Sequence, residues 1–385
     1  MVLRKSGLAA AVILACSPAA FAGDLQINGF MNITAGMLST EDIELDGYDD
    51  GVSFDNGSLV GLQLSKQVND TTSATVQLIS RGSQAYETEA SWAYITYAAS
   101  ENTDIRVGRL RTPIFYYSDF LEVGYAFNWV RPPSTVYRLD SLSSISGVDF
   151  THRFSAGGMD GSVQAYAGRY GGDLALGDDI YSIELRRAMG LVLNMSAGDF
   201  GARVSYHQAG LSIDANPAAA ALVAANPTLT GVVPVRALDQ LAAAGAQAGE
   251  ADAFTADEDK SAFYQASVSY DNGSTSAIAE WTALKHDTAL LNDDSGYLVS
   301  VAQRFSDYTV HLTYTANEDD LKSGNVGVVQ GLAEAKENSV ILGVRYDYDS
   351  GTAFKFDIQQ HDEELVNGAE GESGTLYTVG MSLVF

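Results

Sequence analysis

The sequence predicts an all-β fold, namely a transmembrane antiparallel up-and-down β-barrel of 16 strands with an inward-folded third loop. Three observations predict it. Apolar and polar residues alternate with a period of two, long and short connections alternate between these stretches, and acidic residues gather in the long connections. Period-two alternation predicts strands with one apolar and one polar face. A water-soluble sandwich turns the apolar face inward, whereas a membrane barrel turns it towards lipid.

Residues 1–22 have the pattern of a cleaved export signal. Two basic residues precede a short apolar run, and an A-x-A site ends at Ala22. The run is shorter than the ~20 residues that a membrane-spanning helix needs. Acylation of Cys16 is the alternative, but Leu14 fits poorly two positions before an acylated cysteine, and a cleavage site follows.

The remaining chain, 23–385, is predicted to be a single domain. Cys16 is the only cysteine, so the mature protein would be exported without a disulfide, unlike small disulfide-stabilised secreted domains. The sequence has seven prolines and no Pro-rich or Ser-rich linker between two halves. No stretch after the signal is apolar for long enough to span a membrane as a helix.

The last predicted strand shows the alternation most clearly. Tyr377, Val379, Met381, Leu383 and Phe385 share one face, and such an apolar finish is unusual because chain ends are normally polar and frayed. The predicted strands are 24–38, 57–68, 71–82, 89–99, 103–111, 146–155, 160–170, 179–197, 200–213, 260–271, 274–286, 295–306, 307–317, 337–348, 351–361 and 374–385.

The connections between these strands alternate in length. Long segments follow the odd-numbered strands, and tight turns such as Asn69-Asp70 and Asn272-Gly273 follow the even-numbered ones. A barrel with short turns at one membrane face and long loops at the other accounts for this order, whereas a sandwich does not. The even number of strands returns the C-terminus to the face with the short turns.

Acidic residues are concentrated in the long connections. The chain has 49 acidic and 22 basic residues, a formal net charge of −27, and most of the acidic residues fall in the long connections. A solubilising or halophilic surface would not sort its charge by connection. We therefore predict one acidic rim on a wall of nearly balanced charge, and no nucleic-acid partner.

Motifs for catalysis and metal binding are absent from the sequence. It lacks H-E-x-x-H, G-x-S-x-G, a P-loop and a strand-linked G-x-G-x-x-G, and its five histidines are scattered one to an element. Residues 46–51 resemble part of a calcium loop, but Tyr48 takes a ligand position and Gly57 stands where the bidentate Glu belongs. We predict no enzyme activity, no cofactor and no metal site.

Three stretches resemble strand motifs of the Gram-negative general porins: "VGRLRTP" (107–113), "GVDFTHRF" (147–154) and "LGVRYDYDSGTAFKFDIQ" (342–359). The terminal Phe385 is similar to the signal that the outer-membrane assembly machinery recognises in such barrels. The resemblance implies an integral outer-membrane homotrimer of 16-stranded barrels. Its implied function is that of a water-filled channel for passive diffusion of small hydrophilic solutes and ions.

The connection 112–145 is the expected constriction of this channel. It contains eight aromatic residues, which would form an adhesive patch in water but could be buried against the wall inside the lumen. This matches the third loop of porins, which folds inward. The family's acidic Pro-Glu-Phe-Gly signature is absent, so the acidic candidates come from this sequence alone: Asp119, Glu122 and Asp140.

Basic residues are expected opposite these acids. A charge on the lipid face costs ~2–4 kcal/mol near the midplane, so inward placement is favoured. Arginines facing acids across water would set up a transverse field, although plain ion pairing within the wall is the alternative for each of them. The candidates at the constriction are Arg81, Arg106, Arg109, Arg131 and Arg153, and those lining the pore are Arg203, Arg304, Arg345 and Lys355.

Arg109 is placed differently by two lines of reasoning. Its parity with Ile105 and Val107 points it towards lipid, whereas the porin resemblance points it inward. A β-bulge at Gly108 would reconcile the two.

Selectivity and partners follow from the charge pattern. The acidic rim predicts a weak cation preference that fades as salt rises, because the Debye length is ~10 Å at 0.1 M. Carboxylates of this rim could also hold Ca²⁺ or Mg²⁺ that bridge to lipopolysaccharide phosphates. The alternatives are a substrate-specific channel for sugar, phosphate or peptide, a barrel that acts as adhesin or phage receptor, and an enzyme built on a barrel.

The segment 214–259 is rich in alanine. Its composition is compatible with one or two short helices over the channel mouth and equally with a lack of regular structure.

Overall fold

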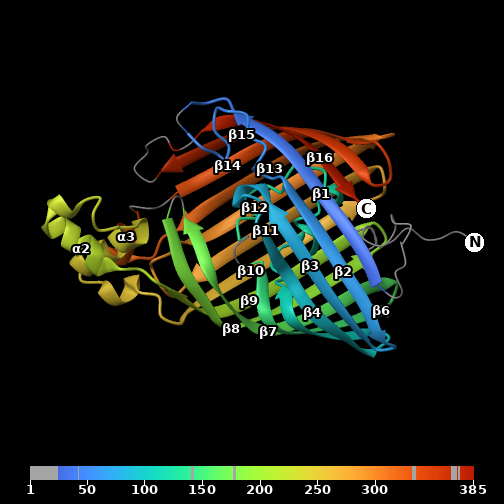
Figure 1. Ribbon diagram of the computed structural model, residues 1–385, viewed down its shortest axis with the longest axis horizontal. Coiled ribbons are helices and arrows are strands. Elements are labelled where there is room, and N and C mark those ends of the chain that lie inside the picture. Colours follow the sequence, from blue (N-terminus) through green and yellow to red (C-terminus); the bar gives the residue numbers. More distant parts are fainter. Residues whose placement is uncertain are drawn as a thin grey trace, which may run out of the picture.

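The computed structural model describes residues 25–41, 43–139, 143–176, 179–331, 335–365, 371 and 373–385. Sixteen antiparallel strands form one closed barrel (Figure 1), in which each strand pairs with its neighbours in sequence and β1 pairs with β16. The predicted signal 1–22 and Asp140 lie outside the described residues. The strands are β1 Leu25–Leu38, β2 Leu59–Asn69, β3 Thr72–Arg81, β4 Thr88–Ser100, β5 Thr103–Arg111, β6 Ser144–Ala156, β7 Met159–Leu176, β8 Asp179–Ala197, β9 Phe200–Ile213, β10 Asp259–Asp271, β11 Thr275–His286, β12 Asp293–Phe305, β13 Tyr308–Asp320, β14 Ala335–Asp347, β15 Thr352–Leu365 and β16 Gly374–Val384.

The predicted all-β barrel of 16 strands is confirmed, with shifts at strand ends. The largest shift is in β7, which continues to Leu176 and stays paired with β8 as far as Asp179. The alternation in this stretch is weakened by Gly171 and Gly172, so the sequence pattern ends early. Tyr181 lies on the part of β8 that pairs with this extension of β7. Its side chain is fully buried, so tertiary packing holds the extension in place.

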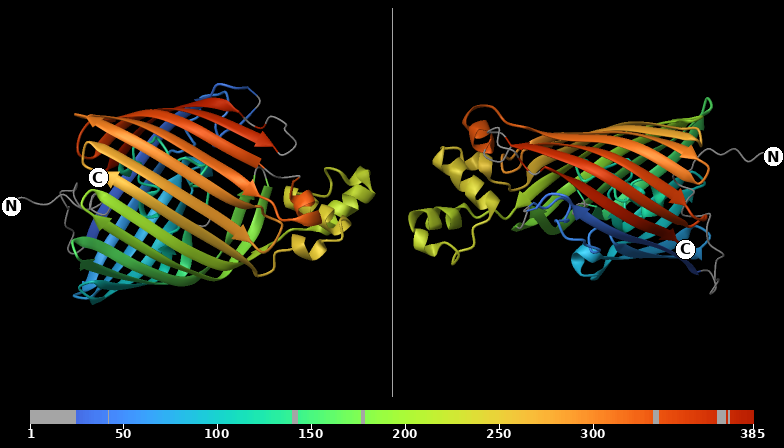
Figure 2. Two further views of the ribbon diagram at one scale, coloured as in Figure 1. Left: turned by 180° about the vertical axis from the view of Figure 1, so that it is seen from behind. Right: turned by 90° about the horizontal axis from the view of Figure 1, so that it is seen from above.

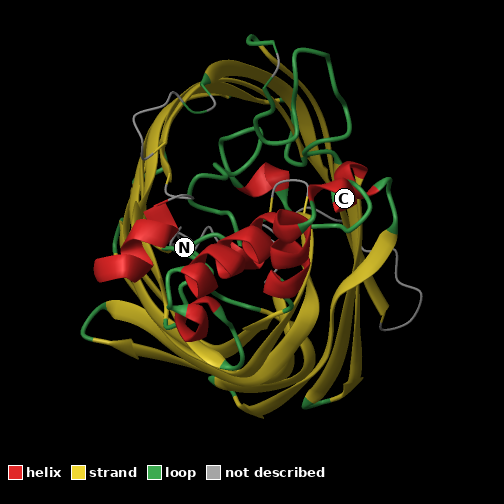
Figure 3. Cartoon of the chain, turned by 90° about the vertical axis from the view of Figure 1, so that its left-hand side faces the viewer, coloured by secondary structure: helices red, strands yellow, loops and turns green. Residues whose placement is uncertain are grey.

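The two ends of the barrel differ as the connection lengths predict. Helices α2 (Pro217–Ala225), α3 (Ala237–Gln247) and α4 (Gly324–Gln330) all lie in connections that follow odd-numbered strands. They gather at one end, and the C-terminus lies at the other (Figure 2). A view from the helical end shows α2 and α3 in front of the ring of strands (Figure 3). At the opposite end the tight turn after β10 places Gly273 at φ +86°, where a Cβ would be strained.

The wall has its apolar face outward. On β13, Leu312 and Tyr314 are about half exposed, whereas His311, Thr313 and Thr315 between and beside them are almost completely buried. This reverses the usual placement in water-soluble proteins and is the arrangement that a lipid-facing wall requires. No helix among the described residues is long and apolar enough to cross a membrane.

The chain end closes the barrel. The backbone N–H of Phe385 donates to the Gly29 carbonyl at 2.9 Å, and the Gly29 N–H donates to the Phe385 carbonyl at 2.6 Å. Tyr377, Val379 and Phe385 are exposed on the outer face, while Thr378 and Ser382 are buried on the inner one. The C-terminal phenylalanine is therefore part of the last strand pairing and of the outward apolar surface.

Candidate pore constriction and mouth

The third long connection packs against the inner wall. Residues 112–139 include two short 3₁₀ turns, η2 (Ser118–Phe120) and η3 (Gly124–Ala126). The buried apolar side chains of this loop form one cluster with inward-facing residues of four strands. The loop contributes Ile114, Phe115, Phe127, Trp129, Val136 and Tyr137, and the wall contributes Phe263, Ile278, Leu298 and Ile341 from β10, β11, β12 and β14.

Wall carboxylates accept hydrogen bonds from this loop. Glu280 on β11 accepts from the Tyr137 hydroxyl at 2.6 Å and from the Tyr116 N–H at 2.8 Å. Asp357 on β15 accepts from the Val130 N–H at 2.7 Å. Burying an unpaired carboxylate is costly, so these donors fix the loop at defined points on the far wall.

Basic wall residues hold the loop from the same side. The Lys355 ammonium donates to the carbonyls of Phe127 and Trp129 at 2.8 and 2.7 Å. The Arg345 guanidinium donates to the Phe127 carbonyl at 2.9 Å. The same kind of contact is made by Arg203, which donates to the Ile114 carbonyl at 3.2 Å.

These three contacts change the role expected for the pore-lining residues. Arg203, Arg345 and Lys355 point inward as predicted, but their exposed fractions are only 5, 7 and 2%. They lie beneath the loop and satisfy its backbone carbonyls, so they do not line open lumen. Residue parity along the strands gave their direction, whereas the covering loop could not be read from it.

Rings of the loop pack edge to face. The Tyr117 ring meets those of Phe120, Trp129 and Tyr137 with centroids 5.5, 5.5 and 5.9 Å apart, all at steep interplanar angles. Such arrangements are preferred by aromatic quadrupoles and add to the area buried. Phe115, Phe127, Trp129 and Tyr137 are at most 4% exposed.

The opposite wall carries accessible charges. The guanidinium of Arg81 on β3 lies 2.6 Å from the Glu122 carboxylate of the loop and also pairs with Glu89 of β4. The guanidinium of Arg111 lies 3.8 Å from the same Glu122 carboxylate and donates to the Ser118 carbonyl at 2.7 Å. Sequence reasoning missed Arg111, although it stands in the "VGRLRTP" stretch directly before the loop.

A second ion pair joins β5 to β6 on this wall. The Arg106 guanidinium of β5 donates to the Asp149 carboxylate of β6 at 2.9 Å and stands 5.6 Å above the Tyr94 ring. The Arg106 side chain is 27% exposed and that of Asp149 only 2%. Asp119 of the loop is exposed and has no ion pair with another described residue.

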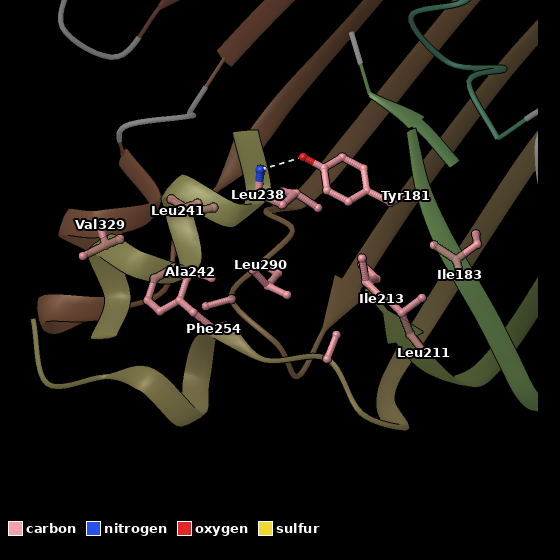
Figure 4. Packing of buried hydrophobic residues seen from close by; sticks show 12 residues of the cluster. Tyr181, Ile183, Leu211, Ile213, Leu238, Leu241, Ala242, Phe254, Leu290 and Val329 are labelled. Atoms are coloured by element: carbon pink, nitrogen blue, oxygen red, sulfur yellow. Dashed lines mark hydrogen bonds between the residues drawn. The ribbon is translucent and has the colours of Figure 1, made fainter. Parts of the chain in front are cut away.

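Helices cover the mouth. Leu238, Leu241 and Ala242 of α3 pack with Phe254 and with strand residues of β8 and β9 in one buried cluster (Figure 4). The Leu238 N–H donates to the Tyr181 hydroxyl at 2.8 Å. Both helices that the alanine-rich composition left open are therefore present: α3 packs on the strands β8 and β9, and α2 packs on α3.

Arg236 fixes the start of α3. Its guanidinium lies 4.3 Å above the Tyr181 ring and pairs with Asp214 and Asp239 at 3.4 and 3.2 Å. Asp239 is 2% exposed. Burial alone raises the pKa of Asp239, but hydrogen bonds from the Arg236 side chain and from the N–H groups of Asn216 and Arg236 outweigh it and leave the pKa below its ordinary value.

Comparison with known proteins decides the family. The model of the Gram-negative porins matches residues 8–382. The chain belongs to that family. No curated protein sequence matches it. This porin is an outer-membrane β-barrel that forms a channel for passive diffusion.

Solved structures share its fold. The outer-membrane channel DcaP of Acinetobacter baumannii is similar with a TM-score of 0.60 and 11% identity, over 95% of this chain and 100% of that one. The trimer form of OmpT of Vibrio cholerae gives 0.56 and 12%, over 94% and 99%. An anion-selective porin from Comamonas acidovorans gives 0.54 and 12%, over 94% and 99%.

The other basic residues predicted for the constriction and the pore lining lie in different parts of the barrel. The Arg153 guanidinium pairs with the Asp104 carboxylate at 2.6 Å and is 55% exposed, near the end with tight turns. Arg304 is exposed at that end too. Arg131 pairs with Asp46 of the first long connection at 3.5 Å. The structure therefore does not gather all of the predicted constriction residues in one place.

Arg109 does not join the constriction. It is in register with Ala93 and Ser146, and the pairing of β5 with both neighbours runs through Gly108 without a bulge. Arg109 is exposed on the face opposite to Arg106. The prediction from residue parity agrees with this placement, and the inward placement implied by the resemblance does not.

No group of three or more His, Cys, Asp or Glu side chains suited to a metal ion occurs among the described residues.

Proposed function

We propose that water, ions and small hydrophilic solutes cross this porin between the third loop and the wall of β3 to β6. One observation carries the proposal: charged side chains of the inner wall are accessible on that side. The Glu89, Arg106 and Arg81 side chains are 45, 27 and 20% exposed. On the covered side, Gln265, Glu280, Thr313, Lys355 and Asp357 are at most 4% exposed.

Charge at this passage supports weak selectivity. The two wall arginines in it, Arg81 and Arg106, each contact a carboxylate, so their positive charge is neutralised locally. Exposed Asp119 and the partly exposed Glu89 remain on its border. With the acidic long connections above, this favours cations weakly, and the preference fades as salt screens the charges.

The substrate-specific alternative gains no support from the loop rings. An aromatic slide needs rings that face the passage, whereas Phe115, Phe127, Trp129 and Tyr137 are packed into the wall. A basic constriction for phosphate needs unpaired cations, and Arg81 and Arg106 are paired. We therefore favour a general channel, and we propose no enzyme activity.

Assembly completes the proposal. We infer a mature single domain 23–385 after cleavage of 1–22, with Phe385 read by the outer-membrane assembly machinery. The trimer form of the similar Vibrio cholerae OmpT supports a homotrimer of this chain.

Planar-bilayer recording of the refolded protein tests the channel. We expect conductance steps in groups of three that grow linearly with KCl, and a salt-gradient reversal potential of cationic sign at low salt. Saturation or block by one sugar, phosphate or peptide would move the function to a specific channel. An anionic reversal potential at low salt would overturn the proposed selectivity.

A further inference from the structure

Five basic residues lie along one row across six neighbouring strands. Arg109 of β5 is in register with Ser146 of β6, and Ser146 is in register with Arg169 of β7. On the other side, Lys260 of β10 is in register with Gly210 of β9, and Gly210 with Arg186 of β8.

A pair of bulges joins the two halves of this row. The β7–β8 pairing jumps from Gly168 and Ala188 to Tyr170 and Leu185, so Arg169 lies level with Arg186 and Arg187. Arg187 itself has a φ of +52°, which is uncommon for a residue with a side chain. The bulges thus bring two adjacent arginines to the height of Arg109 and Arg169. We call Arg109, Arg169, Arg186, Arg187 and Lys260 the basic row.

The basic row faces away from the lumen. Arg109 is two residues beyond Val107, which is 56% exposed, and Ser146 is two residues before Val148, which is 43% exposed. Both valines belong to the outward apolar surface. All five members of the basic row are themselves exposed.

The row also marks the outer edge of that apolar surface. Arg109 is close to the end of β5, where the long third connection begins. Long connections of such barrels lie on the outer side of the membrane. The basic groups thus stand where the apolar outer surface gives way to the mouth, at the level expected for lipid headgroups.

Within the row, Arg109 and Arg169 differ from three basic residues elsewhere in the wall. Arg81, Arg106 and Arg153 each contact a carboxylate. Neither Arg109 nor Arg169 lies within ion-pair distance of a described carboxylate.

The two arginines of β8 in the basic row do form ion pairs with carboxylates. Glu258 pairs with both Arg186 and Arg187, and Glu184 pairs with Arg186. Five basic groups therefore face two paired carboxylates, and the row keeps a positive excess on a chain whose net charge is −27. An anion is the complement of such a surface.

We propose that the basic row binds the phosphate groups of the outer-leaflet glycolipid. Guanidinium groups bind phosphate through paired, charge-assisted hydrogen bonds, and neighbouring strands are ~4.8 Å apart, so one row offers several donors to a phosphorylated headgroup. The outward apolar residues beneath the row are placed to contact the acyl chains of the same lipid. This contact is direct and differs from a divalent-cation bridge at the acidic rim.

Binding of purified, detergent-solubilised trimer to fluorescent, phosphorylated lipopolysaccharide tests the proposal. We expect the double variant R109Q/R169Q to bind ~10-fold more weakly, since two charge-assisted contacts are lost. The matched control is K66Q, because Lys66 is an exposed basic residue on the same outer face but at the opposite end of the barrel. K66Q should bind like the unmodified protein, and dephosphorylated glycolipid should not discriminate among the three proteins.

Further arms distinguish the sources of phosphate. Equal binding by R109Q/R169Q would overturn the proposal, as would loss of binding in EDTA, which would assign the contact to cations at the acidic rim. Displacement by millimolar inorganic phosphate would assign the row to a free anion. If the double variant does not fold, R187Q/K260Q provides the same test from the other half. Conductance and reversal potential should stay unchanged, which separates this result from that on the channel.

Discussion

The Arg81 guanidinium and the Glu122 carboxylate lie 2.6 Å apart and join the wall of β3 to the third loop. Because the partners come from opposite borders of the proposed passage, their ion pair bridges the two borders at this point and sets the local charge there. Arg111 approaches the same carboxylate at 3.8 Å from the base of the loop. Glu122 is therefore shared by two arginines of the inner wall.

Replacing that acid should change ion preference. In E122Q, Arg111 loses its carboxylate partner and Arg81 keeps only Glu89, so the passage becomes more positive. At ~8 Å in water one charge contributes about 0.5 kcal/mol, so the cation-to-anion permeability ratio should fall by about twofold. Reversal potentials in a KCl gradient at low salt measure it.

The control for this prediction is R153Q, which alters an exposed arginine paired with Asp104 near the opposite end. Its ratio should change less than that of E122Q. An unchanged ratio in E122Q would show that ions do not pass this ion pair.

Removing the Lys355 ammonium should loosen the loop. K355M leaves the Phe127 and Trp129 carbonyls without this donor, although Arg345 still reaches Phe127. Unsatisfied buried carbonyls cost ~1–3 kcal/mol each, so we expect a loss of about 2 kcal/mol in the free energy of unfolding by urea.

Arg304 supplies the comparison, because it is a basic residue of the same barrel that is exposed. R304M should change stability by less than ~0.5 kcal/mol. If K355M unfolds at the same urea concentration as the unmodified protein, the lysine does not anchor the loop. Open-channel current noise should rise in K355M and not in R304M.

The sequence predicts which side chains of a strand point into the barrel, but it does not predict which residues of the third loop they contact. Alternation alone gives the inward direction of Lys355, because successive side chains of a strand point to opposite faces. The carbonyl that Lys355 binds on Phe127 is 228 positions away in sequence, and no local pattern encodes this contact. Composition did signal that the aromatic loop would need burial, since its rings could not all remain in water.

The basic row illustrates the same limit. Parity placed Arg109 outward, but its alignment with Arg186 and Arg187 depends on bulges at Gly168 and after Arg186. A bulge shifts the register by one residue without a fixed sequence signal, so the row appears only once the pairing is known.

Truncating Phe254 should release the mouth helices without opening the barrel. Its side chain is 1% exposed and fills the space beside Gly245 of α3. Replacing a buried Phe by Ala typically costs 3–5 kcal/mol, roughly what a small helical cap can supply. In F254A we expect rapid proteolysis within 214–258 and a heat-induced gel shift like that of the unmodified barrel.

L222A is the paired variant, because Leu222 lies on α2 but is 51% exposed. It should leave proteolysis unchanged. Equal protection of 214–258 in F254A and L222A would argue against a cap held by this cluster.

Acid should loosen the same cap through Asp239. The pKa of its carboxyl is below the ordinary value, because hydrogen bonds from Arg236 and Asn216 outweigh the effect of burial. A depressed pKa contributes stability that is present above the ordinary value of ~3.9 and is lost as pH falls through the folded value. Hydrogen exchange of α3 should therefore be constant from neutral pH to about 4.5, after correction for intrinsic rates, and should accelerate below the ordinary pKa. D239N should exchange faster at neutral pH and lose the acid-dependent step, whereas an unchanged step in D239N would assign the titration to another group.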